Sequence, residues 1–231
     1  MNINYTYFLI LLGSIIGPLA LSFDKKVAFH TKWKNLFKAM LLPALFYIIW
    51  DMVFTKQGVW SFNEEYITGI KLYNLPIEEV LFFFIVPYCC VFIYDCVTVY
   101  FSKIVNTPFA NLLLKLIGVV LLVIAIFFHE REYTFFTFFF NGIFIFIFFS
   151  LKKYFATFNI AAFLISYLII LVPFLIINGL LTSIPVVLYN NKENLNLRIY
   201  TIPFEDIFYG MLLVMMNIAG YERLKREKVS T

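Results

Sequence analysis

The sequence predicts an all-α integral membrane protein of about seven transmembrane helices, arranged as two parallel three-helix repeats plus a connector helix. Three observations support this fold class: the composition, the length of the apolar runs and a repeated pattern of polar residues. The 231 residues are 62% hydrophobic and 14% charged, whereas a soluble domain is about 45–50% apolar and about 25% charged. Too little polar surface is left to coat a water-facing globule, and runs of 18 or more apolar residues are typical of membrane spans.

Seven apolar runs define the predicted spans. They cover residues 4–22, 36–55, 77–101, 110–128, 134–150, 157–181 and 204–220. Only the short polar segment 129–133 separates the fourth run from the fifth, so we expect a tight turn there. The first run has no Lys or Arg before it and a basic cluster after it, which favours a retained helix over a cleaved signal peptide.

The distribution of basic residues predicts the orientation. The loop 23–35, the loop 102–109, the segment around Lys152 and the C-terminal tail lie on one side and, with Lys38 and Lys115, hold 13 Lys and Arg residues. The opposite side holds five, namely Lys56, Lys71, Arg131, Lys192 and Arg198. The positive-inside rule therefore places the N-terminus outside and the C-terminus in the cytoplasm.

Polar residues recur at a spacing of 127 positions, which indicates an internal repeat. The coinciding pairs are Lys25-Lys26 with Lys152-Lys153, Asp51 with Asn178, Glu78 with Glu205, Glu79 with Asp206, and Asp95 with Glu222. This predicts a first repeat at 1–101, a connector at 102–130 and a second repeat at 131–231. One helix between two triplets gives both repeats the same orientation, about an axis along the membrane normal. We expect a central groove between them.

Acidic residues within membrane spans indicate function by default. Glu78, Glu79, Glu205 and Asp206 lie in the first turns of the third and seventh predicted helices, on the same membrane face as Asp51 and Asn178. Each pair could instead serve as a simple helix start, since acids complement the positive helix end, and Asp51 could be an interfacial residue. Asp95 and Glu222 lie at the other face, where Glu222 could be a solvated tail residue.

A carboxyl group in a low-dielectric groove has a raised pKa, and a neighbouring carboxyl raises it further. Such an acid keeps its proton near neutral pH and can donate it to a weakly basic substrate. Nearby aromatic rings could stabilise a cation, although packing alone would also explain them. The candidate aromatic residues are Trp50, Phe82, Phe83, Tyr88, Phe208 and Tyr209. This inventory fits protonation of a carbon–carbon double bond followed by carbocation chemistry.

At these residues the chain resembles the membrane lycopene cyclases that occur as heterodimeric subunits or as fused chains. Pro76–Phe83 is similar to the motif of one subunit, and Pro203–Asp206 together with Asn217–Glu222 is similar to that of the other. The resemblance implies protonation of an acyclic carotenoid end group, ring closure and loss of a proton, with no cofactor. It implies a donor at Glu78 or Glu79, a partner at Glu205 or Asp206, and orienting roles for Asp51 and Asn178; Asp95 and Glu222 are further orienting candidates.

Other functions fit the residues less well. No dinucleotide motif is present, the last predicted span lacks the lysine that a retinal protein needs, and no Asp-rich prenyltransferase motif occurs. The two histidines lie in loops and the three cysteines in one apolar run, so no metal site is expected. The net charge of +4 reflects membrane loops rather than nucleic-acid binding. A transporter with parallel repeats and intramembrane acids remains the alternative to a cyclase that takes a lipophilic carotenoid from the bilayer.

Overall fold

The computed structural model describes residues 3–227 and consists of helices with small pieces of sheet. The α-helices are α1 (Thr6–Leu21), α2 (Trp33–Gln57), α3 (Ile77–Tyr100), α4 (Pro108–Phe127), α5 (Glu132–Ser150), α6 (Ile160–Ser183) and α7 (Glu205–Glu227). The strands are β1 (Trp60–Phe62), β2 (Lys71–Leu72), β3 (Leu75–Pro76), β4 (Val187–Tyr189), β5 (Arg198–Ile199) and β6 (Ile202–Pro203). Short 3-10 helices cover Ile3–Tyr5, Phe29–Lys32 and Glu64–Tyr66.

Local sequence signals explain where several helices begin and end. The Thr107 hydroxyl accepts a hydrogen bond from the Ala110 N–H at 3.1 Å, and Pro108 occupies the first position of α4. Asn159 caps α6 in the same way, through the Ala162 N–H at 3.0 Å. Helix α2 ends at Gly58, whose φ of 76° is the left-handed conformation that favours glycine.

The predicted all-α membrane fold is confirmed. Six helices of the described chain, α1 to α6, are long and apolar enough to cross a membrane. The seventh predicted span, 204–220, forms a helix that runs on to Glu227, but α7 does not meet that criterion for a span. Its first turn is acidic, and it packs against α2, α3, α5 and α6 within the bundle. A helix surrounded by other helices needs less lipid-compatible surface.

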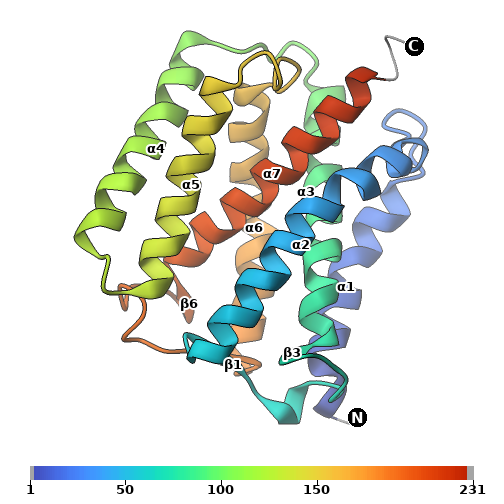
Figure 1. Cartoon of the computed structure of the whole chain (residues 1–231). Helices are drawn as coiled ribbons and strands as arrows, with labels where there is room; N and C mark the ends of the chain where they lie inside the picture. Colours follow the sequence, from blue (N-terminus) through green and yellow to red (C-terminus); the bar gives the residue numbers. More distant parts are fainter. Residues whose placement is uncertain (1–2, 228–231) are drawn as a thin grey trace.

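The two repeats have the same direction and topology. Helices α1 and α5, α2 and α6, and α3 and α7 take matching places in the two triplets, with α4 packed against α5 and α6 (Figure 1). Hairpin β2–β3 and hairpin β5–β6 lie 127 positions apart, and Tyr73 and Tyr200 both adopt a φ of 59° in their turns. The division at 1–101, 102–130 and 131–231 stays a prediction, and residues 1–2 and 228–231 lie outside the described residues.

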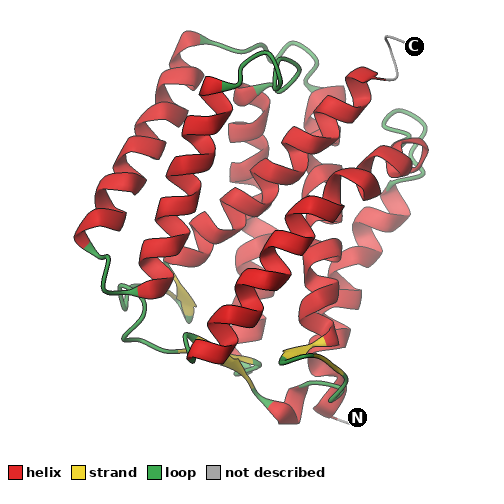
Figure 2. Cartoon of the chain, in the orientation of Figure 1, coloured by secondary structure: helices red, strands yellow, loops and turns green. Residues whose placement is uncertain are grey.

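A two-stranded sheet joins the two repeats at one end of the bundle. Strand β1 pairs with β4 in antiparallel fashion, with Ser61 opposite Leu188 and Trp60 opposite Tyr189. Ser61 and Leu188 are themselves repeat equivalents, 127 positions apart, so the local two-fold axis passes between them. Figure 2 shows the strands gathered at the end where the N-terminus lies, beside the first turns of α3 and α7. None of these short strands was predicted from the sequence.

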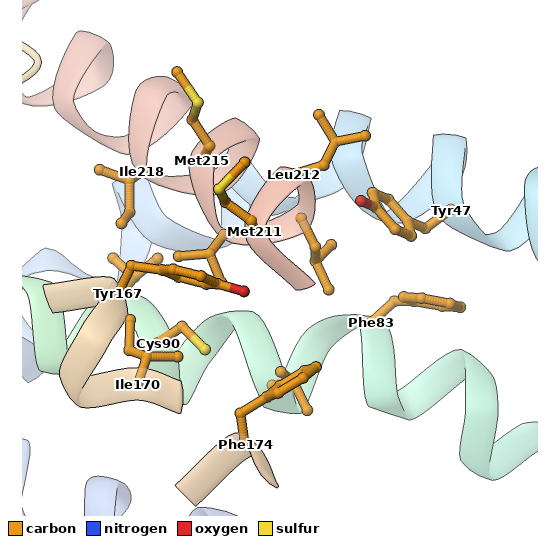
Figure 3. Close-up of a cluster of buried hydrophobic side chains, with 14 of the residues drawn as sticks. Tyr47, Phe83, Cys90, Tyr167, Ile170, Phe174, Met211, Leu212, Met215 and Ile218 are labelled. Carbon is orange, nitrogen blue, oxygen red and sulfur yellow. The ribbon is translucent and has the colours of Figure 1, made fainter. Parts of the chain in front are cut away.

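The interior of the bundle lies between α2, α3, α6 and α7. Figure 3 shows Cys90 of α3 beside Tyr167 and Ile170 of α6, and Phe83 of α3 near Tyr47 of α2, with side chains of α7 above Cys90. The Tyr167 hydroxyl donates to the Ile207 carbonyl and so ties α6 to α7. A Cβ atom at Gly210 would lie 2.8 Å from Cζ of Phe174, so glycine lets this ring lie directly against α7.

Candidate functional site

A small buried cavity of about 40 Å³ lies where the two repeats meet, beneath the β1–β4 sheet. Both repeats supply its walls. Its lining residues are Tyr7, Asp51, Trp60, Phe62, Glu79, Phe82, Tyr133, Phe174, Asn178, Leu181, Val187, Tyr189, Asp206 and Tyr209. The cavity therefore holds three carboxyl groups within a wall that is otherwise mostly aromatic or aliphatic.

The repeat explains how the three carboxyl groups meet. Glu79 and Asp206 lie in the first turns of α3 and α7, and Asp51 lies near the end of α2. All three are buried, with exposed fractions of 8%, 3% and 1% respectively. Asn178 of α6, the repeat equivalent of Asp51, also lines the cavity. The structure thus brings together four of the eight polar residues that the sequence singled out.

Asp51 and Glu79 form a carboxyl pair. Both side chains line the same cavity and lie close enough to interact electrostatically. The Tyr7 hydroxyl donates to Oε2 of Glu79 at 2.6 Å, and Nε1 of Trp60 donates to Oδ1 of Asp51. Among the described residues, Oδ2 of Asp51 has no donor. Two neighbouring carboxyl groups in a buried cavity disfavour a double negative charge, so the pair can hold one proton between them.

Asp206 has a different environment. Its Oδ1 accepts a hydrogen bond from the Tyr133 hydroxyl at 2.5 Å, and its Oδ2 accepts one from the Tyr189 hydroxyl at 3.0 Å. Burial and the neighbouring Asp206 raise the pKa of Tyr189, which lies in the loop sheet, well above its ordinary value. The Tyr189 hydroxyl therefore keeps its proton and can donate a hydrogen bond. Two donors to one carboxyl group favour its charged form.

Glu78 and Glu205 do not line the cavity. Each is fully buried and accepts a backbone hydrogen bond at 2.7 Å, Glu78 from the Thr68 N–H and Glu205 from the Leu195 N–H. These two contacts are themselves repeat equivalents, and Thr134 adds a further donor to Glu205 at 2.6 Å. Both glutamates hold the loops that lead into the hairpins, so the geometry favours Glu79 and Asp206 over them as reacting groups.

Of the six aromatic residues that the sequence singled out, two line the cavity and four do not. Phe82 and Tyr209 line the cavity. Trp50 and Phe83 pack against Tyr47, Phe208 packs against Phe138, and the Tyr88 hydroxyl lies 2.6 Å from that of Ser22. These four residues belong to the packed interior rather than to the cavity wall.

Several residues that line the cavity were not predicted from the sequence as site residues. Tyr7 and Tyr133 come from the first turns of α1 and α5, Trp60 and Tyr189 from the loop sheet, and Phe174 from α6. Tyr7 and Tyr133 recur 126 positions apart, close to the repeat spacing, which is the one signal that could have found them.

Asp95 and Glu222 lie at the opposite end of the bundle from the cavity. Asp95 is fully buried, pairs with Lys32, and accepts hydrogen bonds from the Tyr221 hydroxyl at 3.0 Å and from Nζ of Lys225 at 3.3 Å. Lys225 also pairs with Glu222 at 3.1 Å. This network connects the start of α2 and the ends of α3 and α7, which makes it a structural tie between the repeats.

Replacing Asp95 by asparagine is expected to lower the free energy of unfolding by about 2 kcal/mol, because hydrogen bonds to charged groups contribute about 1.5–3 kcal/mol. Thermal unfolding in detergent measures this. Glu64→Gln is the matched control, because the exposed Glu64–Lys71 pair has side chains that are 65% and 36% accessible and such pairs contribute about 0–1 kcal/mol. Equal loss in both variants would contradict the structural role.

No group of three His, Cys, Asp or Glu side chains within residues 3–227 is arranged to hold a metal ion. The three cysteines are free thiols on α3. The chemistry that the cavity itself offers is proton transfer, because it holds three carboxyl groups, one of them with two phenol donors, in a wall rich in aromatic rings.

Comparison with known proteins agrees with the two-repeat architecture. The model of a family described as lycopene cyclase matches the chain twice, over residues 4–97 and 130–224. Curated proteins named lycopene beta-cyclase, from two strains of Halobacterium salinarum, are 31% identical over 90 residues, which is 37% of this chain and 37% of each relative. The matched segment therefore spans little more than a third of those relatives. No solved structure matches the chain.

Proposed function

The chain belongs to the lycopene cyclase family, and from this premise we propose that it closes the end groups of an acyclic carotene such as lycopene into rings. The observation that carries the proposal is the pairing of Asp51 with Glu79 opposite a separate carboxyl group, Asp206, in one aromatic cavity. Ring closure is an isomerisation, so it needs a proton donor and a proton acceptor but neither an oxidant nor a reductant.

The first step is protonation. The Asp51–Glu79 pair gives its proton to C2 of the end group, which leaves a cation at C1. A neutral carboxyl group is the strongest acid that this cavity supplies, and exclusion of water keeps the proton on the pair until the substrate arrives. We assign the donation to Glu79, because its side chain is more accessible than that of Asp51, at 8% against 1% exposed.

The second and third steps complete the ring. The C5–C6 double bond attacks C1, which forms the C1–C6 bond and moves the cation to C5. Loss of the proton from C6 then gives a β-ring. Asp206 is the acceptor in this scheme, because its two phenol donors favour a carboxylate, and it lies close enough to interact electrostatically with Glu79. One proton enters the substrate and one leaves it.

The aromatic wall suits the intermediate. Trp60, Tyr133 and Tyr209 meet edge to face, with ring centroids 5.2 to 6.1 Å apart. Ring faces attract a cation without offering it a base or a nucleophile. This wall is expected to lengthen the life of the carbocation until the ring has closed.

The orientation in the membrane is part of the proposal. The first turns of α3 and α7, which carry the cavity residues Glu79 and Asp206, lie at the end of the bundle that holds the N-terminus (Figure 1). The larger group of basic residues lies at the other end. With that basic end in the cytoplasm, the acids lie near the outer face and the substrate arrives from the bilayer. Reporter fusions at either terminus test this arrangement.

Expression in bacteria that accumulate lycopene tests the activity directly. We expect the pigment to change from lycopene to monocyclic or bicyclic carotene, as measured by chromatography and absorption. Unchanged lycopene in cells that contain the protein in their membranes would overturn the proposal, and substrate-coupled flux would then favour a transporter.

Gly210→Ala is expected to lower the cyclisation rate several-fold. The new methyl group would press on Phe174, whose Cζ and Cε2 atoms would lie 2.8 and 2.9 Å away, and Phe174 lines the cavity. Overpacking of this kind costs about 1–3 kcal/mol. Gly179→Ala is the control, because its Cβ would meet only Ile202 at 3.8 Å. An equal rate in the two variants would contradict the prediction.

A further inference from the structure

A second cavity, of about 220 Å³, lies between α1, α3 and α6, and we call it the apolar groove. Its walls are almost wholly hydrocarbon and thiol. Pro18 comes from α1, Val86, Cys89 and Ile93 from α3, and Ile170 and Ile177 from α6. Between Phe82 and Ile93 the groove follows α3 for about 16 Å, at about 1.5 Å of rise per residue.

The apolar groove adjoins the buried cavity that holds Asp51, Glu79 and Asp206, which we call the acid cavity. Phe82, Phe174 and Asn178 line both. The groove also reaches the outer surface of the bundle, where Ile176 is 59% exposed. It thus runs from the lipid-facing surface of the helices to the Phe82 and Phe174 rings, which also line the acid cavity.

A proline and a glycine reduce the packing of α1 on the side of the bundle that holds the apolar groove. Pro18 has no N–H, so the carbonyl of Ser14 lacks its helical donor, and the Cys89 thiol donates to that carbonyl at 3.6 Å. Gly13, on the same helix, has no side-chain or distant backbone atom within 4 Å of where its Cβ would lie.

The repeat-equivalent space between α2, α5 and α7 is closed by aromatic rings. Phe140 stands where α1 has Gly13, Phe46 where α6 has Pro173, and Trp50 where α6 has Ile177. Trp50 lies 5.6 Å from Phe46, 5.0 Å from Phe140 and 5.1 Å from Tyr209 between ring centroids. Within residues 3–227, the two-fold frame therefore has a groove on one side and packed aromatic rings at the matching place on the other.

We propose that the polyene chain of the substrate lies in the apolar groove with its end group in the acid cavity, and that the α2–α5–α7 side admits no substrate. The identity of the molecule in the groove, an acyclic carotene, rests on the proposed function. A long, unbranched hydrocarbon fits a narrow groove with no charged side chain in its wall, and it enters from the lipid without crossing water. Both ends of a substrate must then use the same entrance, one after the other.

A bulky side chain in the groove tests the proposal. Ile177→Trp copies on α6 the residue that closes the other side, and Cys89→Trp does so from α3. Val172→Trp, at a lipid-facing position of α6 that is 63% exposed, is the matched control. Each variant is made alone and with Glu79→Gln, purified from lycopene-accumulating cells, and checked for the elution volume and thermal midpoint of the parent. Carotenoid retained per protein and lycopene converted are both measured.

We expect Ile177→Trp and Cys89→Trp to retain at least tenfold less carotenoid, equivalent to about 1.4 kcal/mol, while Val172→Trp matches the parent. If the parent converts lycopene and both groove variants bind and convert it like Val172→Trp, the groove proposal is overturned and the proposed function stands. If the parent retains lycopene without converting it and the groove variants lose it, the groove stands and the proposed function fails. A parent that neither binds nor converts lycopene overturns both.

Discussion

Replacing Glu79 by glutamine is expected to lower the rate of lycopene cyclisation by at least about 100-fold, since a positioned general acid contributes about 10²–10⁴. The amide keeps the size of the side chain and can still accept the Tyr7 hydrogen bond. It cannot share or donate the carboxyl proton that the Asp51 pair provides. Conversion of lycopene per milligram of purified protein measures the effect.

Glu78→Gln is the matched control for this substitution. Glu78 precedes Glu79 in the chain and is also buried, but it accepts a hydrogen bond from the Thr68 N–H, which an amide oxygen can accept as well. We expect this variant to stay within a few-fold of the parent in activity. Loss of activity in Glu78→Gln with activity kept in Glu79→Gln would reverse the assignment of the donor.

The helices could be predicted because each membrane span is a long run of apolar residues in the sequence. Each apolar run ends where the chain must meet water, so six spans were placed within a few residues of α1 to α6. The end of α7 was missed because Arg223 and Lys225 continue a helix that leaves the apolar interior. The strands were missed because segments of two or three residues have no periodicity to detect.

Only part of the site could be predicted, because the sequence does not show which way each side chain points from its helix. The doubled acidic motif located the right turns of α3 and α7, but neighbouring residues on a helix point about 100° apart. Only the packed structure shows that Glu79 and Asp206 face the cavity while Glu78 and Glu205 face the loops. Tyr7 and Tyr133 were not singled out among 15 tyrosines, because their spacing of 126 positions is one short of the repeat and the sequence does not show which first turns meet.

The symmetry of the frame and the asymmetry of the site have separate origins. Equivalent backbone positions place Asp51 and Asn178 on opposite sides of one cavity. An acid on one side forms a pair with Glu79, whereas the amide on the other leaves Asp206 to two tyrosine donors. One amino-acid difference at matched positions thus gives the two carboxyl groups Glu79 and Asp206 different neighbours, and the proposed reaction, in which one proton enters and another leaves, uses that difference.

Replacing Asp206 by asparagine is expected to change the products as well as the rate. Without a carboxylate to take the proton from C6, the C5 cation persists and can lose a proton from C4 or from the C5 methyl group, or capture water. We therefore expect a fall of at least about 100-fold in β-ring formation, together with a larger share of isomeric rings or hydrated product. Chromatography with mass detection separates these compounds.

The control for Asp206 is Glu205→Gln, which keeps acceptors for the Leu195 N–H and the Thr134 hydroxyl and is expected to give an unchanged product pattern. Glu79→Gln provides the second comparison: loss of the donor slows the reaction before any cation forms, so its residual product should have the parent's ring. If Asp206→Asn slows the reaction and leaves the ring type unchanged, Asp206 acts before or during protonation, and its place as the final acceptor is wrong.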